Sequence, residues 1–118
     1  MIGRLHTVVI DCPDPAALAE FYSELLGLPI ISRDSDWVTI GGDDWPLVAF
    51  QLAPDLQPPA WPDSQRPQQF HLDVQVDDID TAEQRVLELG ATRLPGGERT
   101  FRVYADPVDH PFCLEFDA

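Results

Sequence analysis

The chain has 118 residues, of which 21 are acidic and 7 are basic, so its formal net charge is −14. A charge of this sign repels phosphate backbones and anionic lipid surfaces, which argues against nucleic-acid and membrane partners. The sequence contains no run of about 20 apolar residues that would predict a membrane span. It also contains no basic stretch followed by an apolar run that would predict a secretory signal. We therefore expect one compact domain in the cytoplasm, with Cys12 and Cys113 reduced and too far apart in sequence for a zinc knuckle.

The first half of the chain, residues 1–53, predicts a strand, a helix and three further strands. In residues 5–10, branched apolar residues occupy both odd-numbered and even-numbered positions. This pattern is typical of a strand that is covered on both faces. Asp14 is placed to cap the helix, Pro15 suits its first turn and Gly27 ends it. The apolar stripe of the helix recurs with helical spacing and comprises Leu18, Phe21, Tyr22, Leu25 and Leu26. The three short strands that follow are predicted at residues 29–33, 36–41 and 47–53.

The second half, residues 68–118, repeats this order after a proline-rich linker at residues 54–67, where helix and sheet ladders are disfavoured. Its first strand is opened by His71. Its helix is predicted to begin with Asp80 as the cap and Glu83 as the capping-box partner, and to end at Gly90. The remaining strands are predicted at residues 92–94, 99–104 and 112–116.

The two halves are therefore interpreted as one βαβββ module written twice, which is an α+β fold. A histidine opens each module, and we expect His6 and His71 to occupy equivalent places. Neither sheet can bury both of its faces alone, so the two sheets are predicted to form a curved β-structure around a shared cleft. The linker permits pairing of the modules within one chain or exchange between two copies.

Several short motifs resemble those of the vicinal oxygen chelate superfamily, which includes glyoxalase I, extradiol dioxygenases and bleomycin-resistance proteins. The motifs are the histidine that opens each module, F-Y-S-E-L-L-G-L at the end of the first helix and D-P-V-D-H-P-F near the end of the chain. P-P-A-W-P and Q-Q-F-H-L-D-V further resemble the small glyoxalase-like domain proteins. The resemblance covers essentially the whole chain and is more specific for the fold than for the chemistry.

The resemblance implies a divalent metal, such as Zn, Ni, Fe or Mn, held by side chains from both modules. By motif position these ligands fall on His6, Gln51 and His71. The superfamily's enzymes carry a glutamate seven residues after the aspartate of the D-P motif, and this chain has Cys113 there. Glu115 lies on the same strand face, roughly 7 Å further along, and is expected as the fourth ligand and as the candidate catalytic base.

Each of these residues also has a structural interpretation. His6 and His71 are equally well explained as hydrogen-bonded imidazoles, and Gln51 as a hydrogen-bonding group that lines the cleft. Cys113 fits a small core residue, although it is also a candidate for substrate contact together with Trp37 and Trp61. Glu115 is otherwise a solvated residue near the C-terminus.

The function predicted from the sequence is the binding of a small organic ligand in the cleft. A metal-dependent lyase, isomerase or dioxygenase activity is one version of this prediction. The alternatives are a non-catalytic protein that sequesters a cationic or aromatic compound, and a dimerising module with a vestigial site. A homodimer is expected from the resemblance.

Overall fold

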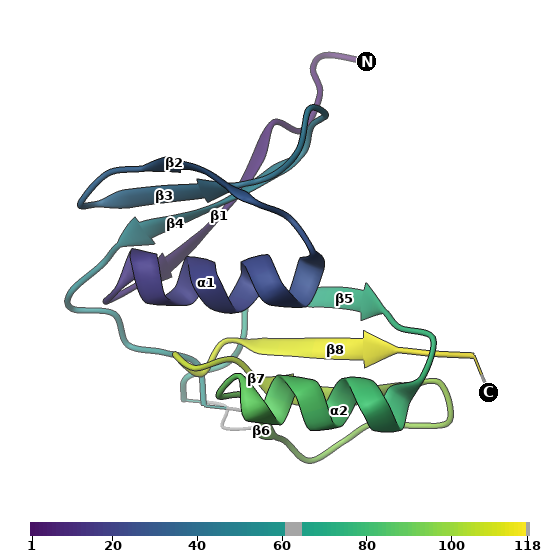
Figure 1. The fold of residues 1–118 in the computed structure, drawn as a ribbon. Helices are drawn as coiled ribbons and strands as arrows, with labels where there is room; N and C mark the ends of the chain where they lie inside the picture. The colour runs from purple at the N-terminus through teal and green to yellow at the C-terminus, as the bar shows by residue number, and fades with distance from the viewer. Residues whose placement is uncertain (61–64, 118) are drawn as a thin grey trace. The chain divides into compact units, whose positions relative to one another are not determined.

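The computed structural model describes residues 1–60 and 65–117, and it divides into two compact units, Met1–Leu56 (unit 1) and Gln57–Ala118 (unit 2). Each unit has one helix packed on one face of a four-stranded sheet (Figure 1). The predicted α+β class with two βαβββ modules is confirmed. Within the described ranges, no helix has the length and apolar character needed to cross a membrane.

Unit 1 contains the five elements that the sequence predicts, with ends that agree to within two residues. They are β1 (Thr7–Cys12), α1 (Pro15–Leu26), β2 (Ile30–Arg33), β3 (Trp37–Ile40) and β4 (Leu47–Leu52). The strand order is β1-β4-β3-β2, in which β1 and β4 are parallel and the other neighbours are antiparallel.

Helix α1 begins and ends where its sequence signals predict. The Asp14 carboxylate accepts a hydrogen bond from the Ala17 N–H at 3.2 Å, and Gly27 ends the helix in the left-handed conformation with φ of 67°. The apolar stripe of the helix faces the sheet, where the ring of Tyr22 stacks on Phe50 of β4 with 5.4 Å between centroids. This packing fixes which face of the sheet the helix covers.

The expectation that the first strand is covered on both faces is wrong for β1. Ile10 is half-buried and Cys12 is fully buried, whereas Val9 is 41% exposed and Asp11 is exposed. The reason is that α1 covers only one face of the sheet. Alternate residues of β1 point to opposite faces, so only every second residue is covered by the helix.

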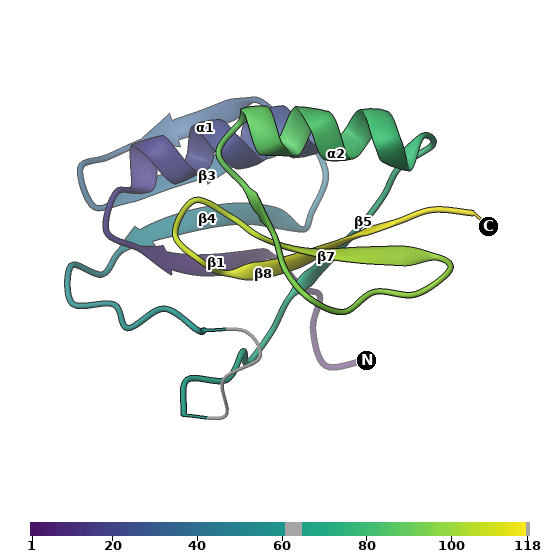
Figure 2. The ribbon, with the colours of Figure 1, turned by 90° about the horizontal axis from the view of Figure 1, so that it is seen from below.

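Unit 2 repeats the arrangement. Its elements are β5 (Leu72–Gln75), α2 (Ile79–Glu88), β6 (Thr92–Arg93), β7 (Phe101–Ala105) and β8 (Pro111–Glu115). The order β5-β8-β7-β6 matches that of unit 1, again with the first and last strands of the module in parallel. Figure 2 shows α2 lying over its sheet, with β5, β7 and β8 beneath it.

The start of α2 differs from the prediction by two residues. Asp78, not Asp80, is the cap, and its carboxylate accepts hydrogen bonds from the N–H groups of Asp80 at 3.1 Å and Thr81 at 3.2 Å. Glu83 does not form a capping box, because its carboxylate accepts a hydrogen bond from the Tyr104 hydroxyl of β7 at 2.8 Å. Tertiary contact therefore decides the role of Glu83.

A tight turn precedes β8 and sets the strand's starting point. The Asp106 side chain is buried, and its Oδ1 accepts hydrogen bonds from the N–H groups of Val108 at 2.8 Å and His110 at 3.0 Å. Asp109 adopts a φ of 71°, a conformation that aspartate tolerates better than most residues. The D-P-V-D-H-P motif thus forms a structured turn that leads directly into β8.

Candidate functional site

The sheet of unit 2 has one face toward its helix and one face away from it. Phe112 of β8 stacks with Tyr104 of β7, and the Tyr104 hydroxyl donates to Glu83 of α2, so these rings face the helix. Successive side chains of a strand point to opposite faces. Cys113 and its register partner Asp73 of β5 therefore lie on the other face, which we call the helix-free face of unit 2.

Three different donor groups converge on this face. His71, just before β5, has the same parity as Asp73, and its Nε2 lies 3.1 Å from Asp73 Oδ1. Cys113 is directly opposite Asp73 in the parallel ladder. One donor atom from each of the three residues lies within 4.8 Å of the other two. An imidazole nitrogen, a carboxylate oxygen and a thiol sulfur are thus gathered at one place, and we call this set the donor cluster.

The Cys113 thiol of the donor cluster is held in its neutral form. Burial raises the pKa of Cys113 to about 11, and the charge of Asp73, its hydrogen bond with the thiol and the charge of Glu115 act in the same direction. The side chain is only 7% exposed. A metal-free Cys113 is therefore a poor nucleophile at neutral pH, although a bound cation would favour the thiolate.

Glu115 lies on the same face but further along β8. It pairs with Gln75 of β5 and Phe101 of β7, one two-residue step beyond the pairing of Cys113 with Asp73. Glu115 does not belong to the donor cluster found among the described residues. Its carboxylate is near enough to raise the pKa of Cys113, which places negative charge beside the cluster.

Sequence reasoning missed Asp73. The signal was present, because His71, Asp73 and Gln75 alternate with the apolar Leu72 and Val74, which predicts one polar face for this strand. The superfamily motif predicts a carboxylate on the last strand of the module. The structure instead places a carboxylate on the first strand of the module, opposite the cysteine.

A constant offset of 64 residues relates the two modules. It relates the capping residues Asp14 and Asp78, and it relates Gln51 to Glu115, each of which occupies the same position in its parallel ladder. Gln51 pairs with Asp11 just as Glu115 pairs with Gln75. Gln51 and Glu115 therefore lie on the last strands of their modules, as predicted. Their positions on these strands are equivalent.

The same offset relates His71 to Thr7, so the prediction that His6 and His71 are equivalent is wrong by one residue. His6 precedes β1, its Nδ1 is hydrogen-bonded to the Thr7 hydroxyl, and its ring lies 4.3 Å from that of Trp45. Arg4 covers the Trp45 ring at 4.8 Å. The convergence of His6 and His71 on one hollow stays a prediction.

In unit 1, the positions equivalent to the donor cluster are Thr7, Val9 and Ala49, which do not reproduce its donors. Gln51 lies on the helix-free face of unit 1 opposite Trp37. The Trp37 indole N–H donates to Thr39 at 3.1 Å. Trp61, the other tryptophan predicted to contact substrate, lies outside the described residues.

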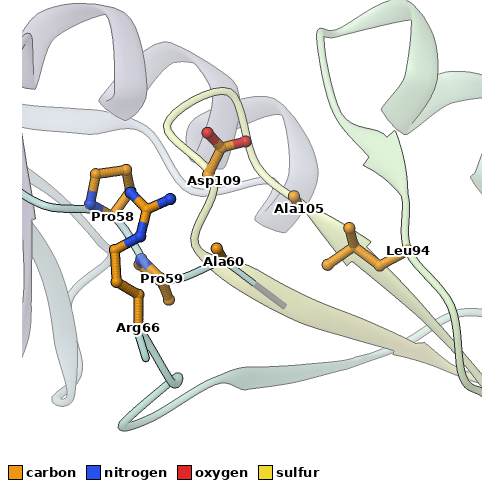
Figure 3. A pocket seen from close by; sticks show the side chains of 7 residues that line it. All are labelled: Pro58, Pro59, Ala60, Arg66, Leu94, Ala105 and Asp109. Carbon is orange, nitrogen blue, oxygen red and sulfur yellow. The ribbon is translucent and has the colours of Figure 1, made fainter. Parts of the chain in front are cut away.

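Two hollows lie away from these side chains. One, of about 250 Å³ in unit 2, has Arg66 reaching toward Pro58 and Asp109 contributed by the turn before β8 (Figure 3). Its other lining residues are Pro59, Ala60, Leu94 and Ala105. A wider hollow of about 680 Å³ in unit 1 is lined by Arg4, Leu5, Asp43, Asp44, Trp45 and Pro46. Neither contains the donor cluster, whose chemistry makes it the stronger candidate site.

Two βαβββ modules with identical strand orders are the architecture of the glyoxalase/bleomycin resistance/dioxygenase fold class. The sequence matches the family described as "Glyoxalase-like domain" over residues 7–115, and the chain belongs to that family. The vicinal oxygen chelate resemblance is thereby confirmed. No curated protein matches the chain.

Solved structures support the same fold. A glyoxalase/bleomycin resistance protein/dioxygenase family enzyme from Burkholderia phytofirmans is 20% identical with a TM-score of 0.76, over 97% of this chain and 98% of that one. The fosfomycin resistance protein FosX from Listeria monocytogenes is 17% identical with a TM-score of 0.73, over 100% and 96%. A glyoxalase/dioxygenase from Nostoc punctiforme is 21% identical with a TM-score of 0.70, over 98% and 91%. At these identities the likeness concerns the fold.

The superfamily implies a divalent metal, and the donor cluster fits one. Ligand atoms around a tetrahedral zinc lie about 2.0–2.3 Å from the ion, and hence roughly 3.3–3.8 Å from one another. The 3.1 Å between His71 and Asp73, and the 4.8 Å limit for the whole cluster, are close to this spacing.

Proposed function

We propose that this chain binds a small organic molecule with adjacent oxygen atoms through a divalent metal, Zn, Ni, Fe or Mn, on the helix-free face of unit 2. The observation that carries the proposal is the convergence of His71 with Asp73 and Cys113. His6, Gln51 and Glu115 remain proposed contributors to the metal site. When bound, the metal supplies positive charge that polarises the oxygens of the ligand.

The residues around the cluster suit this role. Glu115 is the proposed proton acceptor, because it lies on the same face of β8 one step from Cys113. Trp37 and Trp61 are proposed to contact the apolar part of the ligand, and Cys113 to lie beside its oxygens. A lyase, isomerase or dioxygenase reaction is proposed on this basis.

Catechol tests the proposal, with phenol as the matched probe that lacks the second oxygen. We expect the chain loaded with one equivalent of metal to bind catechol at least about tenfold more tightly than phenol in calorimetric titrations. The His71→Ala variant should lose the catechol signal. Its affinity for the metal should fall at least about 100-fold, since even the outer-shell partners of metal ligands contribute roughly 10–100-fold.

Equal catechol binding by metal-loaded, metal-free and His71→Ala protein would contradict the proposal. His6→Ala is the companion variant, and a loss equal to that of His71→Ala would show that both modules supply ligands. Circular dichroism of both variants confirms that the comparison is made between folded proteins.

A second candidate function is the sequestration of a cationic or aromatic compound without catalysis. The net charge of −14 favours it, because a strongly negative field concentrates cations. Its signature is binding of a cationic aromatic dye that needs no metal and weakens steeply with salt. A homodimer is part of either proposal, and sedimentation of the purified chain tests it.

A further inference from the structure

The side chains that converge on the helix-free face of unit 2 differ from those that the superfamily motif implies. The motif has a carboxylate at the position of Cys113, whereas here the carboxylate of the donor cluster is Asp73, across the parallel ladder. Relative to the motif, the cluster therefore has the sulfur of Cys113 in place of a carboxylate oxygen. Its oxygen donor comes instead from Asp73 on the neighbouring strand.

We infer that His71, Asp73 and Cys113 form a nitrogen, oxygen and sulfur site for one thiophilic divalent cation, Zn²⁺ first among them. This inference deepens the proposed function and rests on it for its biological use. Sulfur ligands favour Zn²⁺ over Mn²⁺ and Mg²⁺, which prefer oxygen. Three protein ligands would leave one position on a four-coordinate zinc for water or for a ligand oxygen, as in catalytic zinc sites.

Two of the three ligands come from paired strands, and the third comes from the residue just before β5. Asp73 and Cys113 are paired residues of adjacent strands, so the ladder fixes their separation, and His71 already contacts Asp73 at 3.1 Å. On binding, the thiol of Cys113 loses its proton to solvent as the metal–sulfur bond forms. The net charge of the cluster then rises by one, because the cation adds two positive charges and the released proton removes one.

Unit 1 supplies an internal comparison. The equivalent positions there hold Thr7, Val9 and Ala49, which offer one hydroxyl and two apolar side chains. The inference therefore requires a stoichiometry of one tightly bound metal per chain, located in unit 2.

Cobalt substitution with matched variants tests the site. Co²⁺ bound by a thiolate gives a charge-transfer absorption in the near ultraviolet that nitrogen and oxygen ligands alone do not give. We expect this band in the parent chain at one equivalent of Co²⁺, and its loss in Cys113→Ser. Asp73→Asn should weaken Zn²⁺ binding at least about tenfold in competition with a chromogenic chelator.

Two control variants separate the possible outcomes. Cys12→Ser should leave the band unchanged, because Cys12 is a core residue whose sulfur contacts the backbone oxygen of Gln51 at 3.7 Å. Glu20→Gln should change Zn²⁺ affinity less than about threefold, because the Glu20 carboxylate pairs with Arg33 in unit 1. A band that survives in Cys113→Ser, or Zn²⁺ binding that is as tight in Asp73→Asn as in the parent chain, would overturn the inference.

The same samples distinguish this inference from the proposed function. Metal binding through Cys113 without catechol binding would support the site and remove the function. Catechol binding that depends on Mn²⁺ or Fe²⁺ and persists in Cys113→Ser would overturn the inference and leave the proposed function in place.

Discussion

Alkylation of Cys113 in the native, metal-free chain is expected to be about 100-fold slower at pH 7.5 than alkylation of an ordinary cysteine. The pKa of this thiol is raised from 9.0 to about 11, chiefly by burial, and then by the charge and hydrogen bond of Asp73 and the charge of Glu115. A pKa that is two units higher makes the thiolate fraction at pH 7.5 roughly a hundredfold smaller. Iodoacetamide labelling in the presence of a chelator, followed by peptide-resolved mass spectrometry, measures the rate.

The same peptide labelled in denaturant provides the reference rate. The native rate should keep rising to about pH 11, whereas the reference should level off near pH 9. Because the folded state favours the neutral thiol, this group stabilises the fold below pH 9, and the contribution is lost as pH rises toward 11. Native labelling as fast as the reference at pH 7.5 would show that Cys113 is not held neutral.

Glu83→Ala is expected to lower the free energy of unfolding by roughly 2 kcal/mol. The Glu83 carboxylate accepts hydrogen bonds from Tyr104 at 2.8 Å and from Arg93 at 2.7 Å, and it lies 3.3 Å from Arg102. Its removal leaves the buried Tyr104 hydroxyl without this acceptor. Urea titration at pH 7 measures the difference.

Glu20→Ala is the matched control, since Glu20 also lies in a helix and pairs with Arg33 at 3.0 Å. Its side chain is 61% exposed, against 24% for Glu83, so its loss should change stability by less than about 1 kcal/mol. Equal effects of the two substitutions would mean that the Glu83 contacts do not stabilise the fold.

The contribution of Glu83 should also depend on pH. Burial opposes its ionisation, but hydrogen bonds from Tyr104 and Arg93 and the charges of Arg93 and Arg102 lower its pKa below the ordinary value of 4.5. A lowered pKa stabilises the folded state above pH 4.5 and ceases to do so as pH falls through the native pKa. The difference between the parent and Glu83→Ala should therefore shrink in acid.

Local signals predicted the order of the elements well. The caps and stripe of α1 are short-range features, and Asp14 and Gly27 act where their side-chain chemistry indicates. The start of α2 was predicted less well because D-D-I-D offers three possible capping residues. The choice of Asp78 follows once Glu83 is held by Tyr104, a residue 21 positions away in sequence.

The candidate site was predicted in part. His71 and Cys113 were both identified from the sequence, and the structure brings them together. Asp73 was missed because strand register, which pairs it with Cys113, is a long-range property that one sequence does not specify. The equivalence of the two histidines failed for a local reason, because a slip of one residue moves a side chain to the other face of a strand.

The donor cluster also explains why the chemistry is harder to predict than the fold. Strand pairing and helix packing depend on apolar residues that recur in both modules, such as Phe50 and Leu114, both fully buried. The cluster depends on single side chains that occur in one module only. Thr7, Val9 and Ala49 preserve the backbone of the site in unit 1 without its donors.

X-ray absorption spectroscopy of the chain loaded with one equivalent of Zn²⁺ tests the donor cluster most directly. The account predicts one sulfur neighbour at about 2.3 Å together with nitrogen and oxygen neighbours at about 2.0–2.1 Å, and loss of the sulfur shell in Cys113→Ser. A spectrum with nitrogen and oxygen neighbours alone, or with six oxygens as in hydrated zinc, would contradict it.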